Sequence, residues 1–309
     1  MNPSLGQASV TSSYLFAAGL TLLSGLLFVS SHGIIRHIGG VGGTLHPFEI
    51  AFFSNLFSAL FYLPMFFRRG ASVLKTGKLP LHIVRSLFNV TAITAWYTAL
   101  TLTPLADVIA LGLAAPLFVT LGAFFFLGEK FRTRRWIAVL VGITGALTII
   151  RPGFEDVSIG FLFAILSTVF AAGTKIFAKQ LVKTDSAFTC SAYVAILQTP
   201  ITFFLALFVW QFPTVEQLVW MAAVGILVAM AHLSMVQAYK YVEVSSMEPF
   251  VFVRLVWAAG IGYLAFQEFP GPWTWAGAAI IVAASSYIAR REAKAHTAII
   301  SSRNPAARD

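Results

Sequence analysis

The feature that most limits the fold of this chain is a series of apolar runs with few charges, each close to 20 residues long. Of the 309 residues, 58% are hydrophobic and only 11% are charged, and the mean hydropathy is +0.82. A soluble domain needs roughly 25% charged residues to cover its surface, whereas about 20 apolar residues cross the hydrocarbon core of a bilayer. We therefore expect an all-α polytopic membrane protein.

Ten such runs are separated by turn-forming residues and predict ten transmembrane helices. The expected spans are 13–35, 48–67, 81–102, 105–127, 134–150, 158–179, 187–210, 217–239, 245–267 and 272–289. The connections contain glycine and proline, as in Arg151-Pro152-Gly153, and residues of this kind favour turns. None of the connections is long enough for a soluble domain.

The basic residues are distributed unevenly between the two sides of the expected bundle. With both termini in the cytoplasm, sixteen Lys and Arg residues fall on the cytoplasmic side, and only Arg36 and Arg151 on the other. This bias follows the positive-inside rule. It indicates that the basic residues behind the net charge of +9 contact lipid headgroups and do not bind nucleic acid. We expect a bacterial inner (plasma) membrane protein with cytoplasmic termini, including a basic tail at 291–309.

The chain also repeats itself weakly. Glu129 and Glu268 lie 139 residues apart, each a few residues before a tryptophan. Because each half holds five spans, an odd number, the halves must insert with opposite orientations. Residues 1–151 and 152–290 are therefore expected to form two inverted-topology repeats, an architecture that recurs in secondary transporters and binds substrate where the halves meet.

Polar residues inside the apolar runs are candidates for contacts with a substrate, because a charge at the bilayer centre is costly. Arg254 lies near the middle of the ninth span. It either attracts an anionic group or pairs with a carboxylate such as Asp107 or Glu248. The candidate substrate-binding residues are Asn89, Trp96, His232, Arg254 and Trp257.

Helical periodicity places Arg85, Asn89, Ala92 and Trp96 on one face of the third span, which predicts that this face points into the bundle. Trp96 is either a wall for an aromatic substrate or a packing residue. His232 is either a proton-coupling group or a structural residue held by hydrogen bonds.

Two prolines within expected spans are candidates for gating or hinge positions. Pro116 and Pro249 each remove a backbone donor from a helix. Each is either a hinge for alternating access or a static kink.

Several motifs together resemble the drug/metabolite transporter superfamily, EamA type. They are His46-Pro47-Phe48-Glu49, Pro104-Leu105-Ala106-Asp107, Ala115-Pro116-Leu117-Phe118, Leu127-Gly128-Glu129-Lys130 and Arg151-Pro152-Gly153. The resemblance covers essentially the whole chain and is sharpest in the first half. It implies ten helices in two inverted five-helix repeats, with export or exchange of small organic metabolites. The chain looks most similar to aromatic amino acid exporters, although Ser54-Asn55 stands where many members carry an Arg-Asn pair.

The motifs of other function classes do not occur in the sequence. There is no Gly-x-x-x-x-Gly-Lys phosphate loop and no hydrolase or metalloprotease motif, and the single Cys190 rules out a disulfide or a multi-cysteine metal site. We expect no enzyme activity, no cofactor, no metal and no nucleic acid. The expected partners are a small-molecule substrate and the lipid bilayer, with the protein a monomer or a homodimer.

The predicted function is a secondary transporter that exports or exchanges amino acids with aromatic or other apolar side chains by alternating access. The alternatives are a facilitative channel-like pore, or an exporter of cationic drugs or hydrophobic organic anions.

Overall fold

The computed structural model describes residues 3–40, 42–70, 75–127, 133–153, 157–181, 183–185, 187–238, 241 and 250–303. Within these ranges the secondary structure is helical, with no β-strand, as the composition predicts. The helices are α1 (Pro3–Gly39), α2 (Pro47–Arg69), α3 (Leu79–Leu102), α4 (Leu105–Gly112), α5 (Ala115–Leu127), α6 (Thr133–Ile150), α7 (Ile159–Leu181), α8 (Ala187–Leu207), α9 (Val215–Ala238), α11 (Val253–Phe266) and α12 (Pro272–Arg303).

Four stretches of the described residues are long and apolar enough to cross a membrane. They are Tyr14–Gly39, Leu105–Gly122, Ile159–Ala178 and Val215–Met235, with shorter apolar helices at Arg135–Ile150, Ile196–Leu207 and Val253–Phe266. Helix α3 is not among them, because polar groups such as Arg85 and Asn89 lower its hydropathy. Large apolar side chains such as Leu162, Phe204 and Leu264 are exposed, as expected where lipid takes the place of water.

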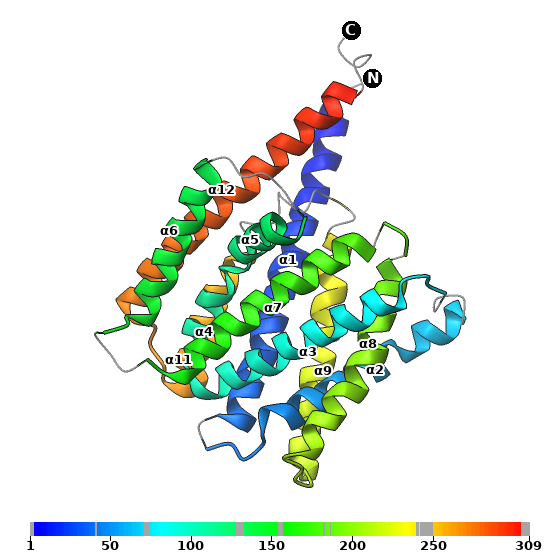
Figure 1. Ribbon diagram of the computed structural model, residues 1–309, viewed down its shortest axis with the longest axis vertical. Coiled ribbons are helices and arrows are strands. Elements are labelled where there is room, and N and C mark those ends of the chain that lie inside the picture. Colours follow the sequence, from blue (N-terminus) through cyan, green and yellow to red (C-terminus); the bar gives the residue numbers. More distant parts are fainter. Residues whose placement is uncertain are drawn as a thin grey trace.

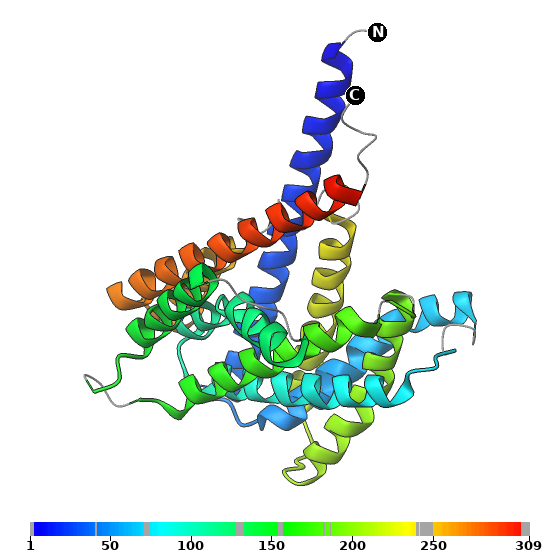
Figure 2. The ribbon, with the colours of Figure 1, turned by 45° about the horizontal axis from the view of Figure 1, so that its top comes forward.

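The main helix contacts join the two expected halves. Helix α1 packs against α9, α3 against α7, α2 against α8 and α6 against α12. In the expected repeat, α1, α2, α3 and α6 correspond to α7, α8, α9 and α12. When each helix is replaced by its counterpart, the α1–α9 contact becomes the α3–α7 contact, and the α2–α8 and α6–α12 contacts stay the same. The start of α1 and the end of α12 lie at the same end of the molecule (Figures 1 and 2).

The fourth expected span, 105–127, is not one helix. It is broken at Leu113 and Ala114 into α4 and α5. Pro116 explains the position of the break, because proline has no N–H for the carbonyl four residues earlier and its ring clashes with that carbonyl. The residue four positions before Pro116 is Gly112, where α4 ends.

The first and last helices are longer than the apolar runs that predicted them. Helix α1 begins at Pro3 rather than at residue 13, and α12 continues to Arg303 rather than ending near residue 289. The expected basic tail is therefore helical as far as Arg303. The added part of α12 is polar, but it contains residues of high helix propensity, as in Arg291-Glu292-Ala293-Lys294.

Helices α6 and α12 cross at two glycines. A Cβ atom on Gly145 would lie 2.8 Å from the carbonyl oxygen of Gly277, and one on Gly277 would lie 2.5 Å from the carbonyl oxygen of Gly145. Real Cβ atoms do not approach backbone this closely, so the crossing depends on glycine at both positions. Small residues allow this kind of close approach between membrane helices.

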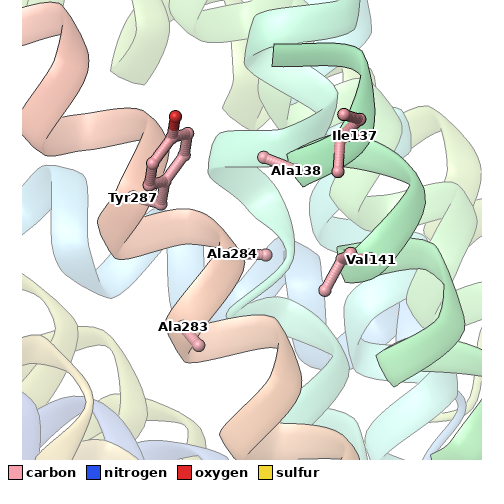
Figure 3. A pocket seen from close by; sticks show the side chains of 6 residues that line it. All are labelled: Ile137, Ala138, Val141, Ala283, Ala284 and Tyr287. Carbon is pink, nitrogen blue, oxygen red and sulfur yellow. The ribbon is translucent and has the colours of Figure 1, made fainter. Parts of the chain in front are cut away.

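An apolar groove of about 460 Å³ lies between the same two helices (Figure 3). It is lined by Ile137, Ala138, Val141, Ala283, Ala284 and Tyr287. Its lining offers a polar metabolite little besides the Tyr287 hydroxyl. The groove therefore suits lipid chains better than a polar substrate.

The α6–α12 crossing gives a stability prediction. We expect Gly277→Ala to destabilise the protein by about 1–3 kcal/mol, because the added methyl group overpacks the crossing, and to lower the midpoint of thermal unfolding in detergent. The matched control is Gly260→Ala in α11, where a Cβ atom meets nothing within 4 Å. An equal effect of the two substitutions would contradict the prediction.

Candidate functional site

One face of α1 forms the centre of a polar and aromatic cluster. Gly25, Phe28 and His32 are spaced by three and four residues and therefore share this face. The Phe28 ring lies 4.9 Å from the ring of His232 in an edge-on contact and 6.4 Å from the stacked ring of His32. The guanidinium carbon of Arg254 lies 4.8 Å from the Phe28 ring centre. Phe28 is thus the contact point of three helices, α1, α9 and α11.

Trp96 joins this cluster from α3. Its Nε1 atom donates a hydrogen bond to Nε2 of His32 at 3.3 Å. The far side of the indole packs on Gly112, where a Cβ atom would lie only 2.6 Å from Cη2 of Trp96. Trp96 is therefore held between α1 and the end of α4, next to the break before Pro116.

Arg254 and Trp257 approach α1 at a glycine. A Cβ atom on Gly25 would lie 3.2 Å from Cγ of Arg254 and 3.7 Å from Cδ1 of Trp257. A Cβ atom at this position would make a tight contact with the Arg254 side chain. The close approach places the Arg254 charge over an aromatic face, which is a favourable interaction when water is excluded.

The structure brings four of the five predicted substrate-binding residues into this cluster, namely Trp96, His232, Arg254 and Trp257. Asn89 lies elsewhere. Its Nδ2 atom donates to Oε1 of Gln198 at 2.6 Å, which ties α3 to α8.

The rest of the predicted stripe on α3 also points into the bundle. Nη1 of Arg85 donates to the carbonyl oxygen of Cys190 at 3.0 Å, and Oγ of Ser167 donates to the carbonyl oxygen of Ala92 at 2.7 Å. Both contacts join α3 to helices of the second half, α8 and α7.

The remaining predictions concern prolines and carboxylates. Pro116 follows the α4–α5 break, whereas Pro249, Glu248 and Glu129 lie outside the described residues. Asp107 accepts a hydrogen bond of 2.6 Å from the hydroxyl of Thr274.

Two members of the cluster were not among the residues predicted from the sequence. Phe28 carries no polar signal, because an aromatic residue in an apolar run is most often packing. His32 carried a usable signal, since it is a histidine within the first expected span, and polar residues at membrane depth need a partner inside the protein.

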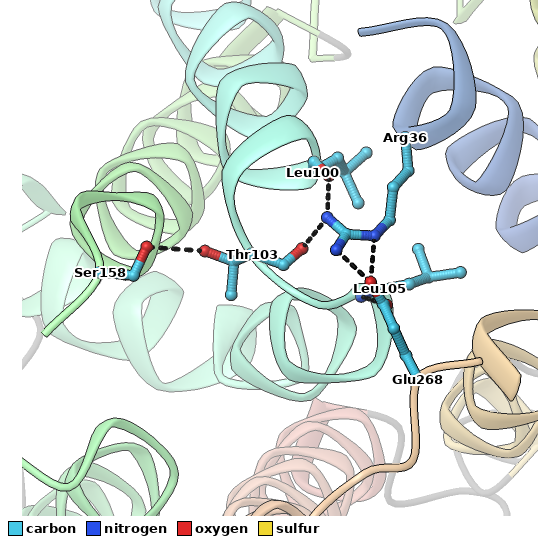
Figure 4. A network of polar contacts seen from close by, with 6 residues as sticks. All are labelled: Arg36, Leu100, Thr103, Leu105, Ser158 and Glu268. Carbon is cyan, nitrogen blue, oxygen red and sulfur yellow. Dashed lines mark hydrogen bonds and ion pairs between the residues drawn. The ribbon is translucent and has the colours of Figure 1, made fainter. Parts of the chain in front are cut away.

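A second polar network lies near one end of α1, and Figure 4 shows its side chains from close by. Arg36, at the end of α1, is 5% exposed and forms an ion pair with Glu268, in the connection between α11 and α12. Its Nη1 atom also donates to the carbonyl oxygens of Leu100 at 2.9 Å and Thr103 at 2.6 Å. Glu268 in turn accepts from the backbone N–H of Leu105 at 3.1 Å. We call this set the Arg36–Glu268 network.

The Arg36–Glu268 network joins the two halves at this end. It links α1 and the α3–α4 turn of the first half to the α11–α12 connection of the second. The sequence places Arg36 in the connection between the first two expected spans, and it marks Glu268 only as the counterpart of Glu129 in the repeat. The pairing could not be read from the sequence, because the two residues are 232 positions apart.

A third polar group lies at the opposite end of α3. Nε2 of His82 lies 2.8 Å from Oδ2 of Asp185, which also accepts a hydrogen bond of 2.5 Å from the hydroxyl of Thr76. The His82 ring stacks on Tyr193 at 4.4 Å. These contacts join the start of α3 to the α7–α8 connection, so this end also has a bridge between the halves.

Among the described residues, no group of three or more His, Cys, Asp or Glu side chains could hold a metal ion.

Comparison with known proteins identifies the class. The EamA-like transporter family matches the chain twice, over residues 11–151 and 158–290. The chain belongs to the EamA-like transporter family, and it is a multi-pass membrane protein of the transporter class.

Two curated relatives cover most of the chain. The S-adenosylmethionine uptake transporter of Rickettsia felis is 30% identical over 282 residues, which are 91% of this chain and 95% of the relative. The riboflavin transporter of Vibrio cholerae is 34% identical over 224 residues, which are 72% and 75% of the two chains. A solved crystal structure, 19% identical, has a TM-score of 0.56 and covers 91% of this chain and 98% of its own, which supports the fold alone.

The Asp185 group gives a prediction on pH dependence. Hydrogen bonds from Thr76 and then His82 lower the pKa of Asp185 below its ordinary value of 3.8. The folded protein therefore binds this proton more weakly than the unfolded chain. The contact stabilises the fold above pH 3.8, and the contribution is lost as the pH falls below that value.

We expect Asp185→Asn to lower the midpoint of thermal unfolding near neutral pH. The difference from the unaltered protein should shrink once the pH falls below the ordinary aspartate pKa. Thermal unfolding in detergent over a pH series measures it. A difference that stays constant through this range would contradict the prediction.

Proposed function

We propose that the protein is a secondary transporter that moves small organic metabolites by alternating access. The observation that carries the proposal is the position of Arg254 over the Phe28 ring, 4.8 Å away, inside a cluster built by both halves. Helices α1 and α3 come from the first half and α9 and α11 from the second. A substrate held by both halves can be exposed to one side of the membrane and then the other as the halves move.

Each residue of the cluster has a different role in binding the substrate. Arg254 attracts an anionic group of the substrate, while Trp96 and Trp257 supply aromatic walls. His232 and Phe28 complete the site on the α9 and α1 sides. Asn89 acts indirectly, because its bond to Gln198 fixes α3 against α8.

The substrate class follows from these groups. An arginine among aromatic rings suits a small metabolite with a planar aromatic part and an anionic group, and aromatic amino acids meet this description. The names of the relatives support a wider class, because S-adenosylmethionine and riboflavin both contain planar heteroaromatic rings. The proposal therefore covers aromatic and heteroaromatic metabolites.

We place the protein in the bacterial inner membrane with both termini in the cytoplasm, as the basic residues indicate. The repeats are residues 1–151 and 152–290. Transport is facilitated or by exchange, so its direction follows the substrate gradients.

Alternating access needs a closure at each end, and we assign one of them to the Arg36–Glu268 network. In the proposed orientation it lies on the non-cytoplasmic side. Arg36 and Glu268 belong to different halves, so movement of the halves apart at this end must separate them. A channel-like pore can be gated at a single constriction, so it does not need a closure at each end.

Removal of Arg254 tests the central site. In liposomes that contain the purified protein, we expect Arg254→Ala to lower kcat/KM for labelled tryptophan, S-adenosylmethionine or riboflavin by about tenfold or more, because a charged hydrogen bond is lost. Arg254→Lys should restore only part of the rate, since lysine lacks the planar guanidinium.

The matched control is Arg290→Ala, an exposed arginine of α12. Flux that rises linearly with concentration and ignores Arg254→Ala would contradict the proposed function and favour a pore.

Removal of the charge on Glu268 tests the closure. We expect Glu268→Gln to destabilise the closed state by about 3–5 kcal/mol, because Arg36 is left buried without its anion. The measurement is the rate at which a membrane-impermeant maleimide labels Leu105→Cys, a position that is 0% exposed, in a Cys190→Ser background. Labelling should be faster in the Glu268→Gln variant. Glu216→Gln, an exposed carboxylate at the start of α9, is the control, and equal labelling in both would contradict the assignment.

A further inference from the structure

The central cluster contains buried polar atoms that have no partner among the described residues. They include Nδ1 of His32, Nε1 of Trp257 and Oγ of Ser24. Ser24 and Phe28 are one helical turn apart on α1. Buried polar groups are normally paired, so these atoms are available to bind a ligand or water.

The hydrogen bond between Trp96 and His32 determines which ring nitrogen of His32 can donate a hydrogen bond. An indole N–H can only donate, so Nε2 of His32 must accept the 3.3 Å hydrogen bond. A neutral imidazole that accepts at one ring nitrogen carries its proton on the other. Nδ1 of His32 is therefore a donor. Nε1 of Trp257 is a donor as well, and the guanidinium of Arg254 has only donors.

These donors come from two helices that meet closely. Gly25 of α1 lies against both Arg254 and Trp257, with 3.2 Å and 3.7 Å from its ideal Cβ position to the nearest atoms of these side chains. His32 lies two turns further along the same face of α1. Phe28, between them, contacts Arg254 and His32.

We propose that the central cluster selects substrates by their hydrogen-bond acceptors, so that aromatic compounds with a carboxylate bind, amino acids included, and aromatic amines of the same shape that lack a carboxylate are rejected. The inference rests on the proposed function and adds the polarity of the substrate to it. The imidazole, indole and guanidinium N–H groups can all donate hydrogen bonds to the oxygen atoms of a carboxylate. An ammonium group has no acceptor for them and would bring a further positive charge beside Arg254. Of the alternatives, organic anions fit this site and cationic drugs do not.

Two ligands with the same indole ring test the proposal. Indole-3-acetate carries a carboxylate and tryptamine carries an ammonium group. We expect indole-3-acetate to bind the purified full-length protein in detergent at least about tenfold more tightly, measured by isothermal titration, and to raise the midpoint of thermal unfolding. Tryptamine binding that is equal or tighter would overturn the proposal. This comparison needs no variant.

A variant then tests the role of Trp257. Trp257→Phe keeps an aromatic wall and removes only the indole N–H donor together with part of the ring. It should weaken indole-3-acetate binding by about tenfold and leave tryptamine binding nearly unchanged. The control is Trp275→Phe, an exposed tryptophan of α12, which should change neither. Equal effects of Trp257→Phe on both ligands would overturn the assignment of its N–H.

Different outcomes contradict this inference and the proposed function. Loss of the preference for the anion, with saturable flux in liposomes intact, would contradict only this inference. Absence of saturable flux would contradict the proposed function.

Discussion

Charged groups inside a bundle that faces lipid must find their partners within the protein, and three arginines show how this constraint organises the structure. Arg36 pairs with Glu268, Arg85 donates to the carbonyl oxygen of Cys190, and Arg254 lies over the ring of Phe28. In each case the arginine and its partner belong to different halves of the chain. Because an unpaired charge at membrane depth is costly, these contacts hold the halves together more strongly than apolar packing alone.

The polar contacts lie at different places along the bundle, and their positions bear on transport. The Arg36–Glu268 network joins the halves at one end, Arg254 lies in the central cluster, and the contact between His82 and Asp185 joins the halves at the opposite end. Movement of one half against the other can therefore open one end while the contacts at the other end persist. The α4–α5 break lies beside Trp96 through Gly112, so a change in the direction of α4 would reach the central cluster directly.

Much of the fold could be predicted, because the lengths of apolar runs and the helical period are local properties of the chain. Most helices lie close to their expected positions, although α1 and α12 are longer than expected. The break in span 105–127 was not predicted, since Pro116 was recognised only as a hinge or kink. Trp96, His232, Arg254 and Trp257 could be singled out because polar and aromatic residues at membrane depth stand out. The hydrogen bond of Asn89 with Gln198 could not be predicted, because the two residues are 109 positions apart in the sequence.

The sequence by itself determined that the chain is a helical membrane protein and which of its residues are too polar to face lipid. Only the tertiary structure decided which of these residues meet. The Arg36–Glu268 pair, the bond between Trp96 and His32 and the approach of Arg254 to Phe28 all join distant segments. Helical periodicity tells which face of a helix turns inward, but the partner on the facing helix depends on how the two halves pack, and that is not a local property of the sequence.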